Sequence, residues 1–321
     1  MHFVDALPTH YSAVTTQTRW CKILQCGVLR FEGPDAQAFL QGQLTNNLDA
    51  LSATRSQFSG YCTPKGRLLA SFLLWQNSGA YYMMLPRPLC EPLRKRLSMY
   101  ILRSKVKAAD VSDELTLFGV EGSVPAGIAA ALPATQHDVA HQDGATLIHL
   151  PVARYLLAVA PAKAVRVDAS LAAQAPVSPS TLWDTLDIEA GIPGVWPATQ
   201  EQFVPQTVNF DLIGAVSFDK GCYPGQEIVA RTHYLGKLKQ RMVRARIATG
   251  ESPAPGDKLF SAPFGPQASG MIVSASAAAQ AGEHDVLAVV QTSALENEAV
   301  HWQSPAGPVL RMTPLPYSIK W

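Results

Sequence analysis

Residues 218–237 read FDKGCYPGQEIVARTHYLGK, and the run KGCYPGQE at their centre sets a single cysteine between two glycines. The residues from Gln226 onward suit a helix that ends at Gly236. Cys222 then lies just before a helix N-terminus, where free N–H groups and the helix dipole favour an anion, and Lys220 adds a positive charge nearby. The glycines let the backbone approach a neighbour closely. We therefore expect a loop that presents a reactive thiol; the alternative is a small buried structural cysteine.

The segments on either side of this loop differ in their predicted secondary structure. Residues 20–110 and 111–240 mix strands and helices, with a hairpin turn at Thr63–Gly66 and a helix over 181–190 that stops at Gly191. After residue 240, short strands recur at even spacing between Gly, Pro and Ser, which is typical of a small β-barrel or sandwich. The sequence therefore predicts an α+β body followed by a C-terminal all-β domain.

Composition limits the possible functions of the chain. It has 321 residues, of which 47% are hydrophobic and 16% charged, and its net charge of +1 gives no reason to expect direct binding to nucleic acid or to a membrane. No run of about 18 apolar residues could span a bilayer, and the stretch MHFVDALPTHYSAV lacks the features of a signal or import peptide. Five cysteines without a C-x-x-C pair indicate a reducing compartment, so we expect a cytoplasmic protein.

The predicted helix TLWDTLDIEAG holds a second candidate site. Glu189 shares a helix face with Leu182 and Leu186, so its carboxylate either reaches solvent at the helix end or needs a hydrogen-bond partner. A planar ligand with adjacent N–H and NH₂ groups, such as a pterin, would be a suitable partner, and Trp183 would offer a stacking surface. The alternative, which spacing alone favours, is a core tryptophan beside a solvated glutamate.

Two other clusters of charged residues and histidines are weaker candidates for a binding site. Seven Lys and Arg residues between positions 87 and 107 accompany the single acid Glu91. They form either a solvated helix face or a site for a polyanion, such as RNA phosphates or the glutamate tail of a folate. His137, Asp138, His141 and Asp143 lack the residues that would complete a tetrahedral metal site, so no metal is predicted.

Six motifs, in this order and spacing, resemble the YgfZ family: FLQGQLTNNL, CTPKGRLLASFLLW, DIEAGIP, FVPQTVNF, KGCYPGQEIVAR and the ending PLPYSIKW. Members of this family are folate-binding proteins linked to the assembly or repair of iron–sulfur clusters, including those of tRNA-modifying enzymes. The family is in turn similar to the T-protein of the glycine cleavage system. The resemblance implies a three-domain ring around a central folate channel: two interleaved α+β domains, about 20–110 and 111–240 within a folate-binding region 1–240, and a β-barrel domain at 241–321.

The resemblance also implies roles for single residues. Trp183 matches a folate-contacting tryptophan of the family, Glu189 matches the glutamate that holds the pterin in the T-protein, and Cys222 matches the signature cysteine. A second folate-contacting tryptophan of the family falls at about Cys26 here, so one wall of the pocket would be remade. The implied reactive residues are Cys222 and Lys220, and the implied cofactor contacts are Trp183, Glu189, Cys26, Tyr223, Gln226 and Glu227.

One departure bears on catalysis. After the hairpin glycine the T-protein has an acidic pair that includes its catalytic aspartate, whereas residues 67–71 read RLLAS here. Aminomethyl transfer needs a carboxylate near the reacting nitrogen to move protons. We therefore expect a protein that binds tetrahydrofolate or a derivative, including polyglutamylated forms, and supports iron–sulfur clusters in client enzymes. The alternatives are a folate-dependent aminomethyl or methyl transferase and a non-catalytic RNA or protein interaction scaffold.

The cysteines limit any role in cluster chemistry. Five scattered cysteines cannot easily hold a four-thiolate cluster within one chain. The expected partners are accordingly a folate and the iron–sulfur client or assembly proteins that would supply further ligands.

Overall fold

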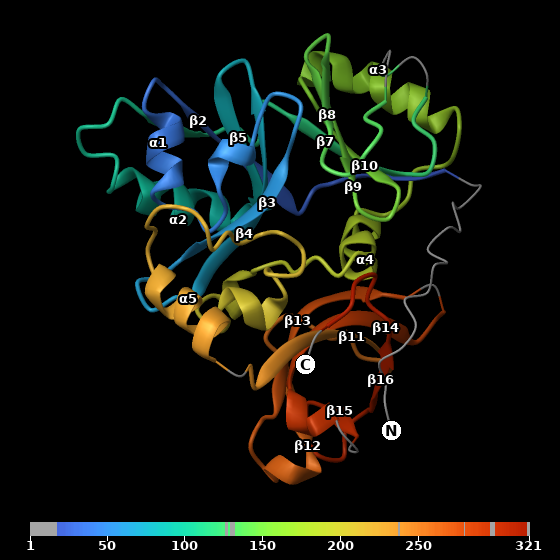
Figure 1. Ribbon diagram of the computed structural model, residues 1–321. Helices are drawn as coiled ribbons and strands as arrows, with labels where there is room; N and C mark the ends of the chain where they lie inside the picture. Colours follow the sequence, from blue (N-terminus) through green and yellow to red (C-terminus); the bar gives the residue numbers. More distant parts are fainter. Residues whose placement is uncertain are drawn as a thin grey trace.

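The structure is a computed structural model that describes residues 18–125, 128, 132–236, 238–278, 280–295 and 299–319. Its strands form three antiparallel sheets, two in the upper half of Figure 1 and one in the lower half. The stretch MHFVDALPTHYSAV and the last two residues of the PLPYSIKW motif lie outside the described residues. No helix among the described residues is long and apolar enough to cross a membrane.

The first sheet has the strand order β3-β4-β5-β2-β6. Its strands are β3 (Gln57–Cys62), β4 (Leu68–Asn77), β5 (Ala80–Pro86), β2 (Cys26–Glu32) and β6 (Lys107–Asp110), and helices α1 (Ala36–Gln41) and α2 (Arg87–Ser98) flank it. The predicted hairpin turn is confirmed: the amide of Gly66 donates to the carbonyl of Thr63 at 2.9 Å, and Gly66 has φ +69°. This φ lies in the left-handed region that glycine adopts most readily.

The second sheet has the order β1-β7-β10-β9-β8. It contains β1 (Arg19–Lys22), β7 (Thr116–Glu121), β10 (Arg154–Val159), β9 (Ala145–Leu150) and β8 (Val139–Gln142), and α3 (Pro161–Ala172) packs on it. β1 precedes the first sheet in sequence but pairs with β7 of the second. The chain therefore visits the second sheet before it forms the first, whereas the division into domains stays a prediction.

The third sheet forms the C-terminal all-β part and has the order β15-β12-β13-β14-β11-β16. Its strands are β15 (Val300–Trp302), β12 (Lys258–Ser261), β13 (Gly270–Ala277), β14 (Glu283–Gln291), β11 (Gln240–Ala248) and β16 (Leu310–Thr313). A bridge between His301 and Val309 brings its two edges together, so the sheet curls into a half-barrel around its own core. The α+β fold with a C-terminal barrel-like sheet is confirmed.

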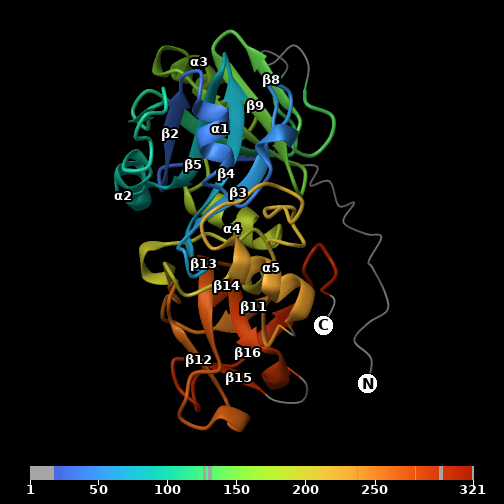
Figure 2. The same ribbon diagram turned by 60° about the vertical axis from the view of Figure 1, so that its left-hand side comes forward.

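Helix α4 (Thr181–Glu189) lies where the three sheets meet. Figures 1 and 2 show it between the upper and lower halves of the molecule. The ring of Trp183 packs against Gly119 of β7, and the hydroxyl groups of Thr185 and Ser276 of β13 lie 2.7 Å apart. The side-chain amide of Gln25, just before β2, donates to Asp184 at 3.0 Å. Side chains of α4 can therefore reach the junction between all three sheets.

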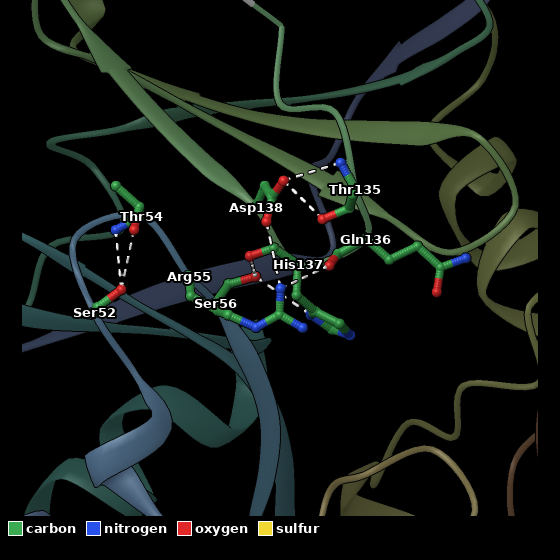
Figure 3. A network of polar contacts seen from close by, with 8 residues as sticks. All are labelled: Ser52, Thr54, Arg55, Ser56, Thr135, Gln136, His137 and Asp138. Carbon is green, nitrogen blue, oxygen red and sulfur yellow. Dashed lines mark hydrogen bonds and ion pairs between the residues drawn. The ribbon is translucent and has the colours of Figure 1, made fainter.

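A polar network joins the first two sheets away from α4 (Figure 3). Arg55 pairs with Asp138 at 3.3 Å, and the amide of Ser56 donates to the carbonyl of His137 at 2.7 Å. Burial lowers the pKa of His137 to about 4, so its ring is neutral near pH 7. The described residues contain no group that could hold a metal ion. The contacts of His137 and Asp138 with Arg55 and Ser56 join the first sheet to the second.

Candidate functional site

A cavity of about 70 Å³ opens beside α4, which is room for about five water molecules. Most of its lining is apolar, including Phe58, Phe72 and Phe210. The polar exceptions are Ser59, Ser71, Asp184 and Asp187, together with the thiol of Cys26. A cavity of this kind, apolar with a few convergent polar groups, is the usual form of a small-molecule site.

Trp183 belongs to the cavity lining, but its ring is almost wholly enclosed, and its contact with a folate stays a prediction. The side chain is 1% exposed, and the guanidinium of Arg154 lies over one ring face at 4.5 Å from the centroid. A Cβ at position 119 would come within 2.4 Å of the ring, so Gly119 makes room for it. The indole N–H has no partner among the described residues. Trp183 therefore offers little ring surface for a ligand to stack on.

Two carboxylates of α4, Asp184 and Asp187, also line the cavity. They lie three residues apart and so project from one side of the helix. Asp187 pairs with Arg154 at 2.6 Å, whereas Asp184 accepts a hydrogen bond from Gln25. Burial raises the pKa of Asp184 to about 6, and the charge of Asp187 adds to that shift. Burial also raises the pKa of Asp187, against the opposing effect of Arg154.

The wall opposite α4 comes from β4 and the segment after α4. The hydroxyl of Ser71 accepts a hydrogen bond from the amide of Val195 at 2.8 Å. No carboxylate stands on residues 67–71, in agreement with the sequence. Trp196 is half-buried and folds over Gly194, where a Cβ would come within 2.9 Å of the indole nitrogen. Trp196 therefore offers more accessible aromatic surface than Trp183.

Sequence reasoning missed Asp184, Asp187 and Trp196 as cavity residues. The two aspartates stand in the quoted motif TLWDTLDIEAG, but the leucine stripe drew attention to the face that carries Glu189. The signal for Trp196 was weaker, since one tryptophan in the loop GVWP has no periodic context. Only the fold shows that this loop lines the same cavity as α4.

The other predicted cavity residues fall in different places. Cys26, at the start of β2, lines the cavity, and burial raises the pKa of its thiol, with further contributions from Asp187 and Asp184. Glu189 is not part of the lining: its carboxylate lies 4.0 Å from the guanidinium of Arg244 on β11. Burial raises the pKa of Glu189 as well. Its assignment to a pterin stays a prediction.

The cysteine loop lies at the start of α5 (Gln226–Leu235), which confirms the predicted helix. Cys222 is the exposed cysteine; Cys26 is half-buried and the other three are buried. Tyr223 is buried beneath the loop. Gly225, with φ +83°, packs so closely on the β3–β4 turn that a Cβ would lie 2.6 Å from Gly66 Cα. The loop is thus fixed to the hairpin while its thiol stays open.

Backbone carbonyl groups bind the ammonium group of Lys220, so this group is not a free charge beside the Cys222 thiol. Its ammonium donates to the carbonyl oxygens of Gln41 and Leu44, both at 2.6 Å, and lies 5.0 Å above the Tyr223 ring. Burial lowers its pKa to about 8.

The remaining loop residues also lie apart from the cavity. The side chain of Gln226 donates to the carbonyl of Lys220 at 3.2 Å, and Glu227 is exposed. None of the predicted loop residues lines the cavity. The predicted site residues therefore form two separate groups, with Cys26 and Trp183 at the cavity and Cys222, Lys220, Tyr223, Gln226 and Glu227 at the loop.

Comparison with known proteins identifies relatives of this chain by sequence and by structure. No family model matches the chain. It is 32% identical over 294 residues to the tRNA-modifying protein YgfZ of Pectobacterium carotovorum subsp. carotovorum, covering 89% of this chain and 88% of that protein. The YgfZ protein of Serratia proteamaculans is 31% identical over 299 residues, covering 91% of this chain and 90% of that protein.

A solved structure has the same fold. The glycine cleavage system aminomethyltransferase T from Bartonella henselae superposes with a TM-score of 0.72 at 13% identity, covering 97% of this chain and 89% of that one. From its sequence relatives and this shared architecture, the chain belongs to the YgfZ family and has the fold of the glycine cleavage T-protein.

Proposed function

We propose that this protein binds tetrahydrofolate or a derivative in the α4 cavity and supports the assembly or repair of iron–sulfur clusters in client enzymes, such as tRNA-modifying enzymes. The observation that carries the folate proposal is the cavity at the junction of the three sheets, in a fold shared with an aminomethyltransferase. The exposed thiol of Cys222 would provide the contact with client or assembly proteins.

The cavity residues suit a pterin in chemistry. Phe72, Trp196 and Phe210 supply apolar surface for a flat ring, and Asp184 and Asp187 supply acceptors for its N–H groups. The indole N–H of Trp183, which lacks a partner among the described residues, could donate to a ring carbonyl. The residues present therefore fit a pterin as donors and acceptors.

The volume of the cavity limits how a pterin could enter it. The enclosed room of about 70 Å³ is smaller than a bicyclic ring, although the hollow holds about 630 Å³ when its open mouth is included. Ligand pockets typically measure about 300–1,000 Å³. The smaller value describes the space available without movement, so binding of a pterin requires the cavity to widen.

Cys222 is suited to intermolecular chemistry because it is the cysteine that a partner can reach. A thiolate is a soft ligand that suits iron–sulfur clusters. One such thiol leaves the other cluster ligands to a second protein or a second copy. Cys222 would then act as one ligand or one nucleophile during transfer or repair of a cluster held largely elsewhere.

Calorimetry with tetrahydrofolate, 5-formyl-tetrahydrofolate and their polyglutamates tests the folate proposal. We expect saturable binding that Trp196→Ala weakens by at least about tenfold, because stacking on the ring is lost. The exposed Tyr234→Ala variant, on α5, should bind like the wild type. Absence of binding by every folate would overturn the proposal.

Complementation tests the cluster proposal separately. In cells that lack the protein, Cys222→Ser should fail to restore the activity of iron–sulfur enzymes, because a neutral hydroxyl is a poor ligand for soft metals. The same variant should bind folate normally, because Cys222 is outside the cavity lining. Full restoration of those activities by Cys222→Ser would remove the thiol from the proposed function.

Folate-dependent group transfer is a second candidate, and one observation favours it. Although β4 lacks a carboxylate, α4 brings Asp184, with a pKa of about 6, to the same cavity. A carboxyl group with a pKa near the working pH is suited to proton transfer. Methylene-tetrahydrofolate formation from tetrahydrofolate and an aminomethylated carrier protein would support this candidate over the first.

The basic residues at positions 87–107 give less support to an RNA scaffold. Arg87 pairs with Asp113, Arg94 and Lys95 pair with Glu91, and Lys107 pairs with Glu32. Four of the seven cations therefore have a carboxylate partner, with Glu91 shared by two of them, and ion pairs of this kind are typical of a solvated helix face.

A further inference from the structure

We infer that Asp184 is the specificity-determining residue of the α4 cavity, and that it recognises an edge of two adjacent N–H donors on a flat heterocycle, as in the 2-amino-4-oxo ring of a pterin. The inference rests on the proposed function, because it names the residue that would select the folate ring. It assigns this role to a residue other than Glu189.

Asp184 differs from its neighbours in how its charge is balanced. Its Oδ1 accepts a hydrogen bond from Gln25 at 3.0 Å, and across the described ranges its Oδ2 has no hydrogen-bond partner. No cation lies within ion-pair distance of Asp184 in the part of the chain that the structure describes. Asp187, by contrast, is paired with the fully buried Arg154. Asp184 is thus the carboxylate of the lining whose charge no cation balances among the described residues.

A carboxylate in an apolar wall is costly unless a donor satisfies it. Burial accordingly raises the pKa of the Asp184 carboxyl. Asp184 also lies in the first turn of α4, where the helix dipole favours an acid. The helix dipole explains why an acid lies near the start of α4. It does not explain why that acid lines a cavity.

The lining indicates the shape and charge of the complementary group. A carboxylate has about four lone-pair sites, so Asp184 can keep the bond from Gln25 and accept two more N–H groups. Arg154 already balances Asp187, so the site leaves one negative charge to be met by neutral or weakly positive donors. The aromatic side chains of Phe58, Phe72 and Trp196 favour a planar ligand.

Glu189 fits this role less well in the structure. It lies outside the cavity lining, and its carboxylate is 4.0 Å from Arg244 and within the electrostatic influence of Glu121, Arg19 and Asp285. Those residues belong to β1, β7 and the third sheet. Glu189 therefore faces the contact between the second and third sheets and serves as a matched acidic control on the same helix.

The test compares tetrahydrofolate with its 2-oxo analogue, in which a carbonyl replaces the 2-amino group, by calorimetry at pH 7.5. Wild-type protein should prefer tetrahydrofolate by at least about tenfold, because the carbonyl of the analogue faces a carboxylate. In Asp184→Asn the amide presents one acceptor and one donor, so the preference should vanish or reverse. Glu189→Gln should keep the wild-type preference.

The outcomes separate the two proposals. If wild-type protein binds neither compound, the proposed folate function fails and this inference with it. If wild-type protein binds tetrahydrofolate and Asp184→Asn keeps the same preference, the inference alone is overturned. A loss of preference in Glu189→Gln instead would move the role to that residue. Thermal melting of each variant shows whether it is folded, and the wild-type preference measured at pH 5 and 7.5 gives an independent test, since protonation of Asp184 should reduce it.

Discussion

The guanidinium of Arg154 lies 4.5 Å from the ring centroid of Trp183 while it also pairs with Asp187 at 2.6 Å. Arg154 is fully buried, and its Nε and Nη1 atoms have no partner among the described residues. One side chain on β10 therefore positions both the tryptophan and one carboxylate of the cavity wall on α4. This relationship links the stability of the second sheet to the shape of the candidate site.

Arg154→Met should lower the free energy of unfolding at pH 7.5 by about 3 kcal/mol, because removal of one partner leaves the carboxylate of Asp187 without its cation. Urea unfolding measures the change. The double variant Arg154→Met/Asp187→Asn should recover part of the loss, because it also removes the stranded charge. A double variant less stable than the single one would show that the ion pair is not what Arg154 contributes.

Asp184 should make stability depend on pH. Its pKa is about 6 in the folded protein against an ordinary 3.8, so between these pH values the folded state binds more protons than the unfolded state. This contribution to stability is present below about pH 4 and is lost as pH rises through 6. Of the titratable groups nearby, Asp187 adds to the shift, and Cys26 and Cys21 are uncharged in this range.

The variant Asp184→Asn isolates that contribution. It should match the wild type at pH 3 and exceed its unfolding free energy by roughly 1–2 kcal/mol at pH 7.5, a value below the full shift because the carboxylate faces a cavity open to water. The comparison between variants also removes the opposite trend from His137, whose lowered pKa makes stability fall at acid pH. Parallel pH profiles for the two proteins would contradict the prediction.

Gly225→Ala should destabilise the protein by about 2 kcal/mol or more, because φ +83° strains an L-residue and the new Cβ would meet the Thr63 carbonyl at 2.4 Å. Gly221→Ala is the matched control: no atom lies within 4 Å of its Cβ position, so its change should stay within about 0.5 kcal/mol. Thermal melting followed by circular dichroism gives both values. Equal effects in the two variants would mean that the contact with the hairpin does not fix the loop.

Cys222 should react with iodoacetamide first among the five cysteines at pH 7.5, followed by the half-buried Cys26. The others should label slowly, because they are buried and because burial raises the pKa of Cys21 and Cys90 to about 11. Mass spectrometry of peptides from a time course gives the order, with guanidinium-unfolded protein as the control in which all five label. Earlier labelling of Cys26 would place the reactive thiol in the cavity.

The sequence could predict the features that depend on local patterns. The hairpin at Thr63–Gly66, the helix that starts at Gln226 and the C-terminal run of short strands follow from turn residues and periodicity, and all three are confirmed. The missing carboxylate on β4 could also be read directly, because the relevant residues are adjacent in the chain.

Long-range contacts explain what the sequence could not show. The sequence does not show that Arg154 lies over the ring of Trp183, because only the fold brings these two residues together. The hydrogen bonds from Lys220 to the carbonyl groups of Gln41 and Leu44 likewise join residues more than 170 positions apart. Asp184 and Glu189 are both acids of one short helix, so only the packing of that helix decides which of them lines the cavity. Helical spacing identifies a face but not the neighbour that covers it.

The contact between Gly225 and Gly66 sets the distance between the thiol and the cavity. β4 leaves this turn and reaches the cavity at Ser71, five residues later, which corresponds to about 17 Å of extended strand. Under the proposed function, a client enzyme that contacts Cys222 therefore does not need to contact a ligand bound in the cavity. The β3–β4 hairpin contacts the cysteine loop at its turn and lines the cavity farther along its strands, so a single element joins two sites whose chemistries stay separate.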